Sequence, residues 1–330
     1  MDKKHKVLLP QPIEAEAQEY LEKNNCEIIL CSKCEHDEVA EKIKEAEAIV
    51  LRTGIHITRD LIEKGKNLKT ISRTGGGVDN VDLDAATEHK IIVTSSLGSN
   101  TTTVIEHTIA LILALSKNLL LMDREVRKGN FKVRYKNMSY DVKEKTLGVI
   151  GLGRIGAGLA KICKESFGMN IIGNDDYIPA DVKEKNYKWI KFLDIDTLLA
   201  ESDFVSVHVP LTEQTHGIIN YERMKKMKKT AIIINTSRGG IIEEKDLIRA
   251  LQEGIIAAAG LDVYEKEPPA EDNPLLKMEN VILTPHSAAL TAECTLRMAI
   301  DGVKRVVKFF DGQMPENIAN PAVLDLLSKG

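Results

Sequence analysis

The sequence predicts an α/β protein built from two doubly wound parallel sheets. Short apolar runs alternate with charged segments of helical periodicity over almost all of the 330 residues, which is the pattern of parallel strands connected by helices. The runs fall into two series, separated by a long apolar segment at residues 101–129. Because a single hydrophobic core rarely grows to include this many residues, we expect two domains.

Composition limits the classes of partner. The net charge is -4 at pH 7, and this near-neutral balance gives no electrostatic footprint for nucleic acid. The N-terminus has no apolar signal region, and no uncharged run is long enough to span a bilayer. We therefore expect a cytoplasmic protein with neither a nucleic acid nor a membrane partner.

The cysteines predict free thiols. They number 5 and are scattered, so a disulfide framework is not expected. Cys31 and Cys34 form a Cys-x-x-Cys pair with Cys26 and His36 nearby, and a zinc or redox site is one interpretation of it. No second such pair exists, and Cys26 and Cys31 frame a strand-like run. We favour buried or loop thiols and expect no metal.

The first series contains the strands of one α/β domain. Each run is apolar and is separated from the next by a charged amphipathic helix or a turn. The runs are Val7–Leu9, Ile28–Leu30, Ala48–Leu51, Lys69–Ser72 and Ile91–Val93.

The apolar segment at 101–129 is expected to be helical and buried. Its central part, Val104–Leu115, is too apolar for a solvent-exposed helix, and the segment is too polar at its start for a membrane. We expect it to pack between domains or subunits. A homodimer could bury it symmetrically, and packing inside one chain is the alternative.

The second series predicts six parallel strands, a number that suits a dinucleotide-binding fold. The runs are Leu147–Ile150, Ile171–Gly173, Phe204–Val207, Ala231–Ile234, Ala257–Leu261 and Val281–Leu283. Residues 291–312 then have the pattern of a helix that returns to the first domain. That domain would comprise residues 1–100 and 291–330, and residues 101–290 would form the second.

A Gly-x-Gly-x-x-Gly segment follows the first run of this series. Gly151, Gly153 and Gly156 stand between the apolar run Thr146–Ile150 and a segment of helical periodicity. In this context the first glycine permits a tight turn, the second lets a pyrophosphate approach the backbone, and the third lets the helix pack closely. The phosphates would then face the N-terminus of the helix.

Asp175 ends the next run, about 20 residues beyond the glycines, where a ribose-binding acid is expected. A carboxylate there accepts hydrogen bonds from ribose hydroxyls and repels a 2′-phosphate, so we expect NAD rather than NADP. Asp176 could share or take over this role. The alternative is an aspartate that caps a helix.

Three charged residues follow the last three runs. Arg238, Glu267 and His286 each lie in a loop flanked by glycine or proline. In open α/β sheets, ligands bind beyond the carboxyl ends of the strands. We therefore expect these side chains to meet at one edge of the sheet.

Their chemistry suits the reduction of a carbonyl. His286 can donate a proton near neutral pH, and Glu267 can orient the imidazole and favour its protonated form. Arg238 can bind a substrate carboxylate or polarise an oxo group. Taken singly, the histidine could cap a strand, the arginine could pair at the surface and the glutamate could begin a turn.

A run of three glycines in the first domain is a candidate anion site. Gly75, Gly76 and Gly77 follow a strand-like run and present backbone N–H groups without side chains, which suits a carboxylate. The alternative is a turn before the helix that starts near Asp82.

These motifs occur in the same order as in D-isomer-specific 2-hydroxyacid dehydrogenases, which the chain resembles over essentially its full length. The segments are Asn-x-x-Arg-Gly at Arg238, Asp-Val-Tyr-x-x-Glu-Pro at Glu267 and Pro-His at His286. The resemblance implies an oxidoreductase that transfers a hydride between NAD and carbon 2 of a D-2-hydroxy or 2-oxo acid. It also implies a Rossmann NAD-binding domain inserted in a flavodoxin-like substrate domain.

The expected site residues combine the motifs with this resemblance. The catalytic residues are Arg238, Glu267 and His286. Cofactor contacts are expected from Gly151, Gly153, Arg154, Ile155, Gly156, Asp175, Val209, Pro210, Thr215, Thr236, Asp262 and Ser287. Substrate contacts are expected from Arg52, Arg73, Gly75, Gly76, Gly77 and Asn100.

Basic residues bear on the choice of acid. Arg52, Arg73 and Arg134 could gather a phosphate or a second carboxylate. The segments around Arg52 and Arg73 and the segment Thr146–Gly156 are most similar to 3-phosphoglycerate dehydrogenases, which implies D-3-phosphoglycerate. The segment Pro285–Ala289 departs from the form common in those enzymes. A glyoxylate or hydroxypyruvate reductase is therefore the nearest alternative.

Two further expectations concern regulation. The chain stops soon after the return helix, so we expect no serine-binding regulatory domain. Transcriptional corepressors that resemble this family keep its nucleotide fold, and an NADH-sensing binding protein is therefore the alternative of another class.

Overall fold

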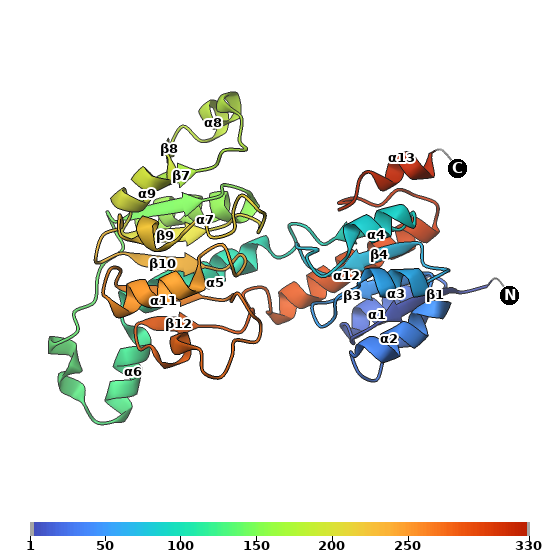
Figure 1. Cartoon of the computed structure of the whole chain (residues 1–330), viewed down its shortest axis with the longest axis horizontal. Helices are drawn as coiled ribbons and strands as arrows, with labels where there is room; N and C mark the ends of the chain where they lie inside the picture. Colours follow the sequence, from blue (N-terminus) through green and yellow to red (C-terminus); the bar gives the residue numbers. More distant parts are fainter. Residues whose placement is uncertain (1–2, 329–330) are drawn as a thin grey trace. The chain divides into compact units, whose positions relative to one another are not determined.

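Two separate parallel sheets organise the chain, of which the computed structural model describes residues 3–328 (Figure 1). One unit contains the described residues up to Asn100 together with those from Leu290 onward, and Thr101–Ala289 form the other. The α/β class with two doubly wound parallel sheets is confirmed.

The first unit has a 5-stranded sheet in the order β2-β1-β3-β4-β5, the flavodoxin-like order. Its strands are β1 (His5–Leu9), β2 (Cys26–Leu30), β3 (Ala48–Leu51), β4 (Thr70–Arg73) and β5 (Ile92–Ser95). Its helices are α1 (Ala15–Lys23), α2 (His36–Lys42), η1 (Ile43–Glu45), α3 (Arg59–Lys64), α4 (Leu83–Glu88), α12 (Ala292–Phe310) and α13 (Val323–Leu327). Every predicted run of this unit overlaps one of these strands.

Alternating residues of this sheet build one core on each face. Leu8, Ile49 and Leu51 pack with α2, α3 and α4, whereas Val7 and Leu9 pack with α1 and α12. Because successive strand residues point to opposite faces, helices on both faces make the strands apolar throughout. Helix α12 thereby returns the chain to the first unit and packs on β3, β4 and β5.

The second unit has a 7-stranded sheet in the order β12-β11-β10-β9-β6-β7-β8. Its strands are β6 (Thr146–Ile150), β7 (Asn170–Asn174), β8 (Lys191–Phe192), β9 (Phe204–Val207), β10 (Ile232–Asn235), β11 (Ala258–Leu261) and β12 (Val281–Leu283). Its helices are α5 (Thr101–Ser116), α6 (Leu119–Arg127), η2 (Phe131–Tyr135), α7 (Arg154–Phe167), α8 (Ala180–Asn186), α9 (Ile195–Glu201), α10 (Tyr221–Met224), α11 (Glu244–Gln252) and η3 (Pro274–Lys277).

The six expected strands are present, but the count of six is wrong. The additional strand, β8, has 2 residues at the edge of the sheet, too few to produce an apolar run. The strand order reverses between β6 and β9, which is where a doubly wound sheet binds its ligand.

The apolar segment at 101–129 is two helices rather than one. Asn118 has a φ of 52°, a left-handed conformation that asparagine tolerates and that ends a helix. Helix α5 packs on β10, β11 and α7 of its own unit. This is the second of the two expected arrangements, packing inside one chain. Among residues 3–328 no single helix is long and apolar enough to cross a membrane; α5 and α6 meet that criterion only as a pair bent by 58°.

Candidate active site

The glycine-rich loop after β6 has the geometry that a pyrophosphate needs. Gly151 has a φ of 86°, and a Cβ there would lie 2.6 Å from the carbonyl oxygen of His208, so only glycine fits. A Cβ on Gly156 would lie 2.0 Å from the carbonyl oxygen of Gly151, so α7 packs directly on the loop. At Gly153 nothing lies within 4 Å of an added Cβ, which leaves that part of the backbone open to a ligand.

Helix α7 begins beside this opening. Arg154 and Ile155 form its first turn, and the N-cap residue Gly153 has no side chain to accept their hydrogen bonds. The N–H groups at the start of a helix favour an anion through their partial positive charge. The loop and the helix therefore fit a dinucleotide phosphate.

Asp175 joins the end of β7 to the glycine-rich loop. Its Oδ2 accepts a hydrogen bond of 2.8 Å from the N–H of Leu152. Its Oδ1 accepts from the N–H groups of Tyr177 and Ile178, at 3.0 and 3.2 Å. The alternative of a helix cap does not apply, because the next helix, α8, has Pro179 as its N-cap. Asp176 is exposed.

Val209 and Pro210 follow β9, on the other side of the switch point. A Cβ on Gly151 would lie 2.8 Å from Cγ1 of Val209, so this side chain borders the glycine-rich loop. Thr215 is buried; its hydroxyl donates to the carbonyl oxygen of Pro210 at 2.6 Å and accepts from the N–H of Thr212 at 2.8 Å. The hydroxyl of Thr215 thus closes the 210–215 turn.

The loop after β10 carries Arg238 and is braced by Asn235. The amide of Asn235 donates to the carbonyl oxygen of Arg238 at 2.8 Å, and its oxygen accepts from the N–H and the hydroxyl of Ser237 at 3.0 and 2.8 Å. A Cβ on Gly239 would lie 1.8 Å from the carbonyl oxygen of Tyr264, so the loops after β10 and β11 touch there. Sequence reasoning missed Asn235, although it opens the Asn-x-x-Arg-Gly segment.

His286 and Glu267 form a hydrogen-bonded pair. Nδ1 of His286 lies 2.7 Å from Oε2 of Glu267, and Oε1 accepts from the N–H of Tyr264 at 3.1 Å. Because an ionised carboxylate only accepts, Nδ1 carries a hydrogen and Nε2 is left to exchange a proton with a ligand. Their side chains are 41% and 37% exposed, so a ligand can reach them.

The charges of this cluster keep Glu267 ionised. Burial acts to raise the pKa of its carboxyl, but the hydrogen bond and charge of His286, the N–H of Tyr264 and the charge of Arg238 outweigh it and hold the pKa below its ordinary value. Arg238 is therefore electrostatically coupled to the pair. The structure brings the three expected catalytic residues together at one edge of the sheet.

The lowered pKa of Glu267 predicts how stability changes with pH. A carboxyl whose pKa is lower in the folded state stabilises the fold above its unfolded pKa, and this stabilisation is lost as the pH falls through the folded value. Between about pH 5 and pH 3 the free energy of unfolding should fall more steeply for the wild type than for Glu267→Gln. Denaturant titrations at several pH values would measure both slopes. The difference should be small because the group is partly exposed, and identical slopes would contradict it.

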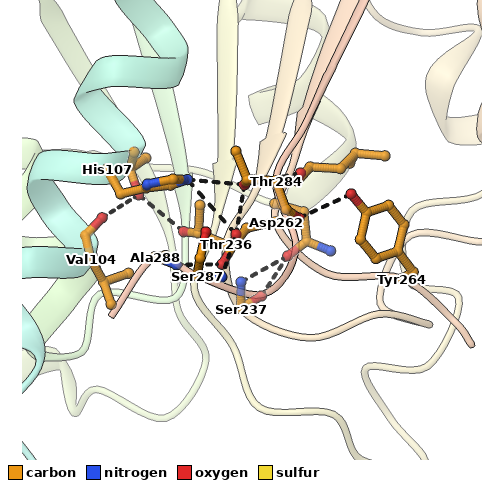
Figure 2. A network of polar contacts seen from close by, with 12 residues as sticks. Val104, His107, Thr236, Ser237, Asp262, Tyr264, Thr284, Ser287 and Ala288 are labelled. Carbon is orange, nitrogen blue, oxygen red and sulfur yellow. Dashed lines mark hydrogen bonds and ion pairs between the residues drawn. The ribbon is translucent and has the colours of Figure 1, made fainter. Parts of the chain in front are cut away.

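Thr236, Asp262 and Ser287, three further expected cofactor residues, lie close together in one polar network (Figure 2). Asp262 is 1% exposed and accepts hydrogen bonds from the N–H groups of Ser287 at 2.8 Å and Ala288 at 2.9 Å. The hydroxyl of Thr236 lies 3.0 Å from that of Thr108 on α5. Asp262 therefore uses both carboxylate oxygens to hold the loop that follows His286.

In the first unit, the glycine run follows β4. A Cβ on Gly75 would lie 1.3 Å from Nη1 of Arg73, and one on Gly76 would lie 3.7 Å from Oδ1 of Asn100. The guanidinium of Arg73 thus lies over the first glycine, and the amide of Asn100 borders the second. Gly77 is half-buried. The loop thus brings a guanidinium and an amide beside the glycines, and the N–H of Gly75 already donates to the carbonyl oxygen of Arg73 at 3.0 Å.

The three arginines discussed for substrate binding have different surroundings. Arg52 follows β3 and lies 3.4 Å from Glu14. Leu51 pairs with Arg73 across neighbouring parallel strands, so both arginines come from the same edge of that sheet. Arg134 belongs to the other unit, with its guanidinium 4.6 Å from the ring of Phe131.

The cysteine pair is not part of a metal cluster. Among residues 3–328 no group of three or more His, Cys, Asp or Glu side chains is placed to hold a metal ion. Burial raises the pKa of the Cys31 and Cys34 thiols, and it raises that of Cys26 to about 11. These thiols stay protonated at neutral pH.

A family model agrees with the site. The model described as D-isomer specific 2-hydroxyacid dehydrogenase, NAD binding domain, matches residues 109–288. These residues carry the glycine-rich loop, Asp175 and the cluster around His286.

Curated relatives and solved structures match along most of the chain. A D-3-phosphoglycerate dehydrogenase of Archaeoglobus fulgidus is 42% identical over 96% of the chain and 59% of its own length. A glyoxylate reductase of Korarchaeum cryptofilum is 39% identical over 88% of both chains. The structure is similar to that of a D-lactate dehydrogenase from Aquifex aeolicus complexed with NAD and lactic acid, with a TM-score of 0.85, 32% identity, and coverage of 96% and 99%. The chain thus spans about 59% of the length of the phosphoglycerate dehydrogenases that it matches.

Proposed function

Because the chain belongs to the D-isomer specific 2-hydroxyacid dehydrogenase family, we propose that it transfers a hydride between NAD and carbon 2 of a D-2-hydroxy or 2-oxo acid. The observation that carries the proposal is the 2.7 Å contact between His286 and Glu267, coupled to Arg238. An acid-base pair beside a fixed positive charge is what the reduction of a carbonyl requires.

NAD would be held at the switch point of the second sheet. The open backbone at Gly153 and the start of α7 would take the pyrophosphate. Oδ2 of Asp175 accepts one hydrogen bond from the protein, and a carboxylate oxygen can accept two. The second position suits a ribose hydroxyl. When bound, the nicotinamide supplies or accepts the hydride.

His286 would move the proton. In the reductive direction negative charge develops on the substrate oxygen, and the imidazolium donates from Nε2 because Nδ1 is engaged with Glu267. The glutamate carboxylate stabilises the positive imidazolium and fixes the plane of the ring. In the oxidative direction the neutral imidazole accepts the hydroxyl proton. Arg238 would bind the carboxylate of the substrate or polarise its oxo group.

For the substrate we propose D-3-phosphoglycerate. In this proposal the glycine loop and Asn100 bind its carboxylate, and Arg52 and Arg73 bind the phosphate. Two guanidinium groups at the ends of neighbouring strands suit a doubly charged phosphate. The second candidate is glyoxylate, because the glyoxylate reductase relative matches over 88% of its own length.

Steady-state oxidation of NADH tests the proposal. The panel should contain glyoxylate, hydroxypyruvate and the 2-oxo acid that corresponds to D-3-phosphoglycerate, and we expect the highest kcat/KM for the phosphorylated acid. Arg52→Ala should lower that value by about 10- to 100-fold and leave the value for glyoxylate within about threefold. A higher kcat/KM for glyoxylate would make glyoxylate the substrate in place of D-3-phosphoglycerate. Tight binding of NADH without turnover of any acid would favour an NADH-sensing binding protein.

Replacing Asp175 by alanine should weaken NAD binding by about 10-fold or more. It should also reduce the preference for NAD over NADP, because the repulsive carboxylate is lost. Fluorescence titration of NADH and NADPH measures both effects. Asp176→Ala is the matched control and should change neither constant by more than about twofold. If Asp176→Ala has the larger effect, that residue is the ribose contact.

We also propose a homodimer in the cytoplasm. Apolar side chains are concentrated on residues 119–140, where Tyr135 and Met138 are each 71% exposed. Leu120, Leu121 and Met138 line an open groove of about 520 Å³ beside this segment. Such a surface on one chain is typical of an interface. Light scattering should give twice the mass of the chain, and Met138→Asp should shift the equilibrium toward the monomer.

A further inference from the structure

A series of hydrogen bonds connects α5 to the loop that carries His286 (Figure 2). Nε2 of His107 lies 3.0 Å from the hydroxyl of Thr284, which follows β12. The hydroxyl lies 2.6 Å from Oδ1 of Asp262, and Nε2 of His107 is 3.8 Å from the same oxygen. The sequence offered no signal for this contact, because His107 and Thr284 are 177 positions apart.

The direction of each hydrogen bond in this series follows from the donors and acceptors that each side chain has. Asp262 already accepts from the N–H groups of Ser287 and Ala288, so its carboxylate acts as an acceptor. The single hydrogen of the Thr284 hydroxyl therefore points to Asp262. The threonine oxygen must then accept from Nε2 of His107, so that nitrogen carries a hydrogen.

The loop held by this series of hydrogen bonds contains a strained residue. His286 has a φ of 51°, a left-handed conformation that is unfavourable for a residue other than glycine and persists only where its surroundings hold it. Its N–H donates to the carbonyl oxygen of Asp262 at 2.8 Å. Asp262 thus holds the loop at two points. Its carbonyl oxygen binds the N–H of His286, and its carboxylate binds the N–H groups of Ser287 and Ala288.

We propose that His107 is a positioning residue for His286. By donating to Thr284 it fixes the direction of the threonine hydroxyl, which keeps the Asp262 carboxylate turned toward the N–H groups of Ser287 and Ala288. The imidazole of His286 is then presented in one orientation. The catalytic consequence rests on the function proposed above, whereas the effect on the loop does not depend on it.

Two matched pairs of variants test this inference in the full chain. His107→Phe and Thr284→Val remove the donor and the hydroxyl while nearly preserving shape, and His107→Gln and Thr284→Ser restore a polar group at a similar reach. Hydrogen exchange of the Ser287 and Ala288 amides reports the state of the loop directly. The kcat and KM for the preferred oxo acid, with the Kd for NADH, report its consequence.

We expect His107→Phe and Thr284→Val to speed exchange of the two amides by about 10-fold and to lower kcat by about 10-fold. KM and the Kd for NADH should stay within about twofold, and the two restoring variants should recover at least half of each loss. The double variant should lose little more than either single one, because both act through one path.

Other results would overturn the inference. Unchanged exchange in His107→Phe shows that His107 does not hold the loop. Faster exchange with unchanged kcat shows that the hold has no catalytic role, while the proposed function stands. If the wild type turns over no acid, the proposed function fails, and the exchange data alone then decide whether His107 supports the loop.

Discussion

Replacing His286 by alanine is expected to lower kcat by about 10²- to 10⁴-fold, the usual contribution of a general acid. Of the three side chains, the imidazole is the one suited to exchange a proton with the substrate, because a guanidinium is a poor proton donor and the lowered pKa of Glu267 keeps its carboxyl ionised. The Kd for NADH should stay within about twofold, since the glycine-rich loop and Asp175 lie at other strand ends. Stopped-flow and equilibrium fluorescence measure the two quantities.

Glu267→Gln is the matched comparison for this variant. It keeps the shape of the partner side chain but removes the charge that stabilises the imidazolium, so kcat should fall by less than in His286→Ala. A His286→Ala protein with wild-type kcat would remove the histidine from proton transfer. A large rise in the Kd for NADH would instead place it in cofactor binding.

Arg238→Ala is expected to lower kcat/KM by about 10²- to 10³-fold, the size of the loss when a preorganised charge is removed from a developing oxyanion. Arg238→Lys should recover only part of the loss, because an ammonium keeps the charge but not the planar fork that binds a carboxylate. The way the loss divides between kcat and KM then identifies the role.

A loss confined to KM assigns Arg238 to the substrate carboxylate, whereas a loss in kcat assigns it to the reacting oxygen. Circular dichroism should be unchanged in both variants, since Arg238 lies in a loop. If both variants keep the wild-type kcat/KM, the arginine has neither role.

The strands could be predicted because both sheets are covered on both faces. Burial on two sides makes each strand a continuous apolar run, and β3, β9 and β12 coincide with the predicted runs. Strand β8 could not be found in this way, because two residues at an edge leave no pattern. The break at Asn118 was also missed, since the apolar residues continue on either side of it.

The positions of the charged site residues could be predicted for a topological reason. Parallel strands end at one edge, so residues after β10, β11 and β12 must be neighbours. The sequence does not show which atoms those residues engage. The hydroxyl of Thr215 closes its own loop, and both oxygens of Asp262 bind backbone. Such bonds depend on side-chain packing, for which apolar periodicity carries no information.

The hydrogen bond between Asp175 and the N–H of Leu152 has a consequence for redesign. Replacing this acid by a neutral or basic residue, in order to accept a phosphorylated coenzyme, also removes a hydrogen bond that holds the glycine-rich loop, where the diphosphate is proposed to bind. In the proposed binding mode, selectivity and tight binding therefore depend on the same side chain. A successful switch would need a second substitution that anchors the loop again.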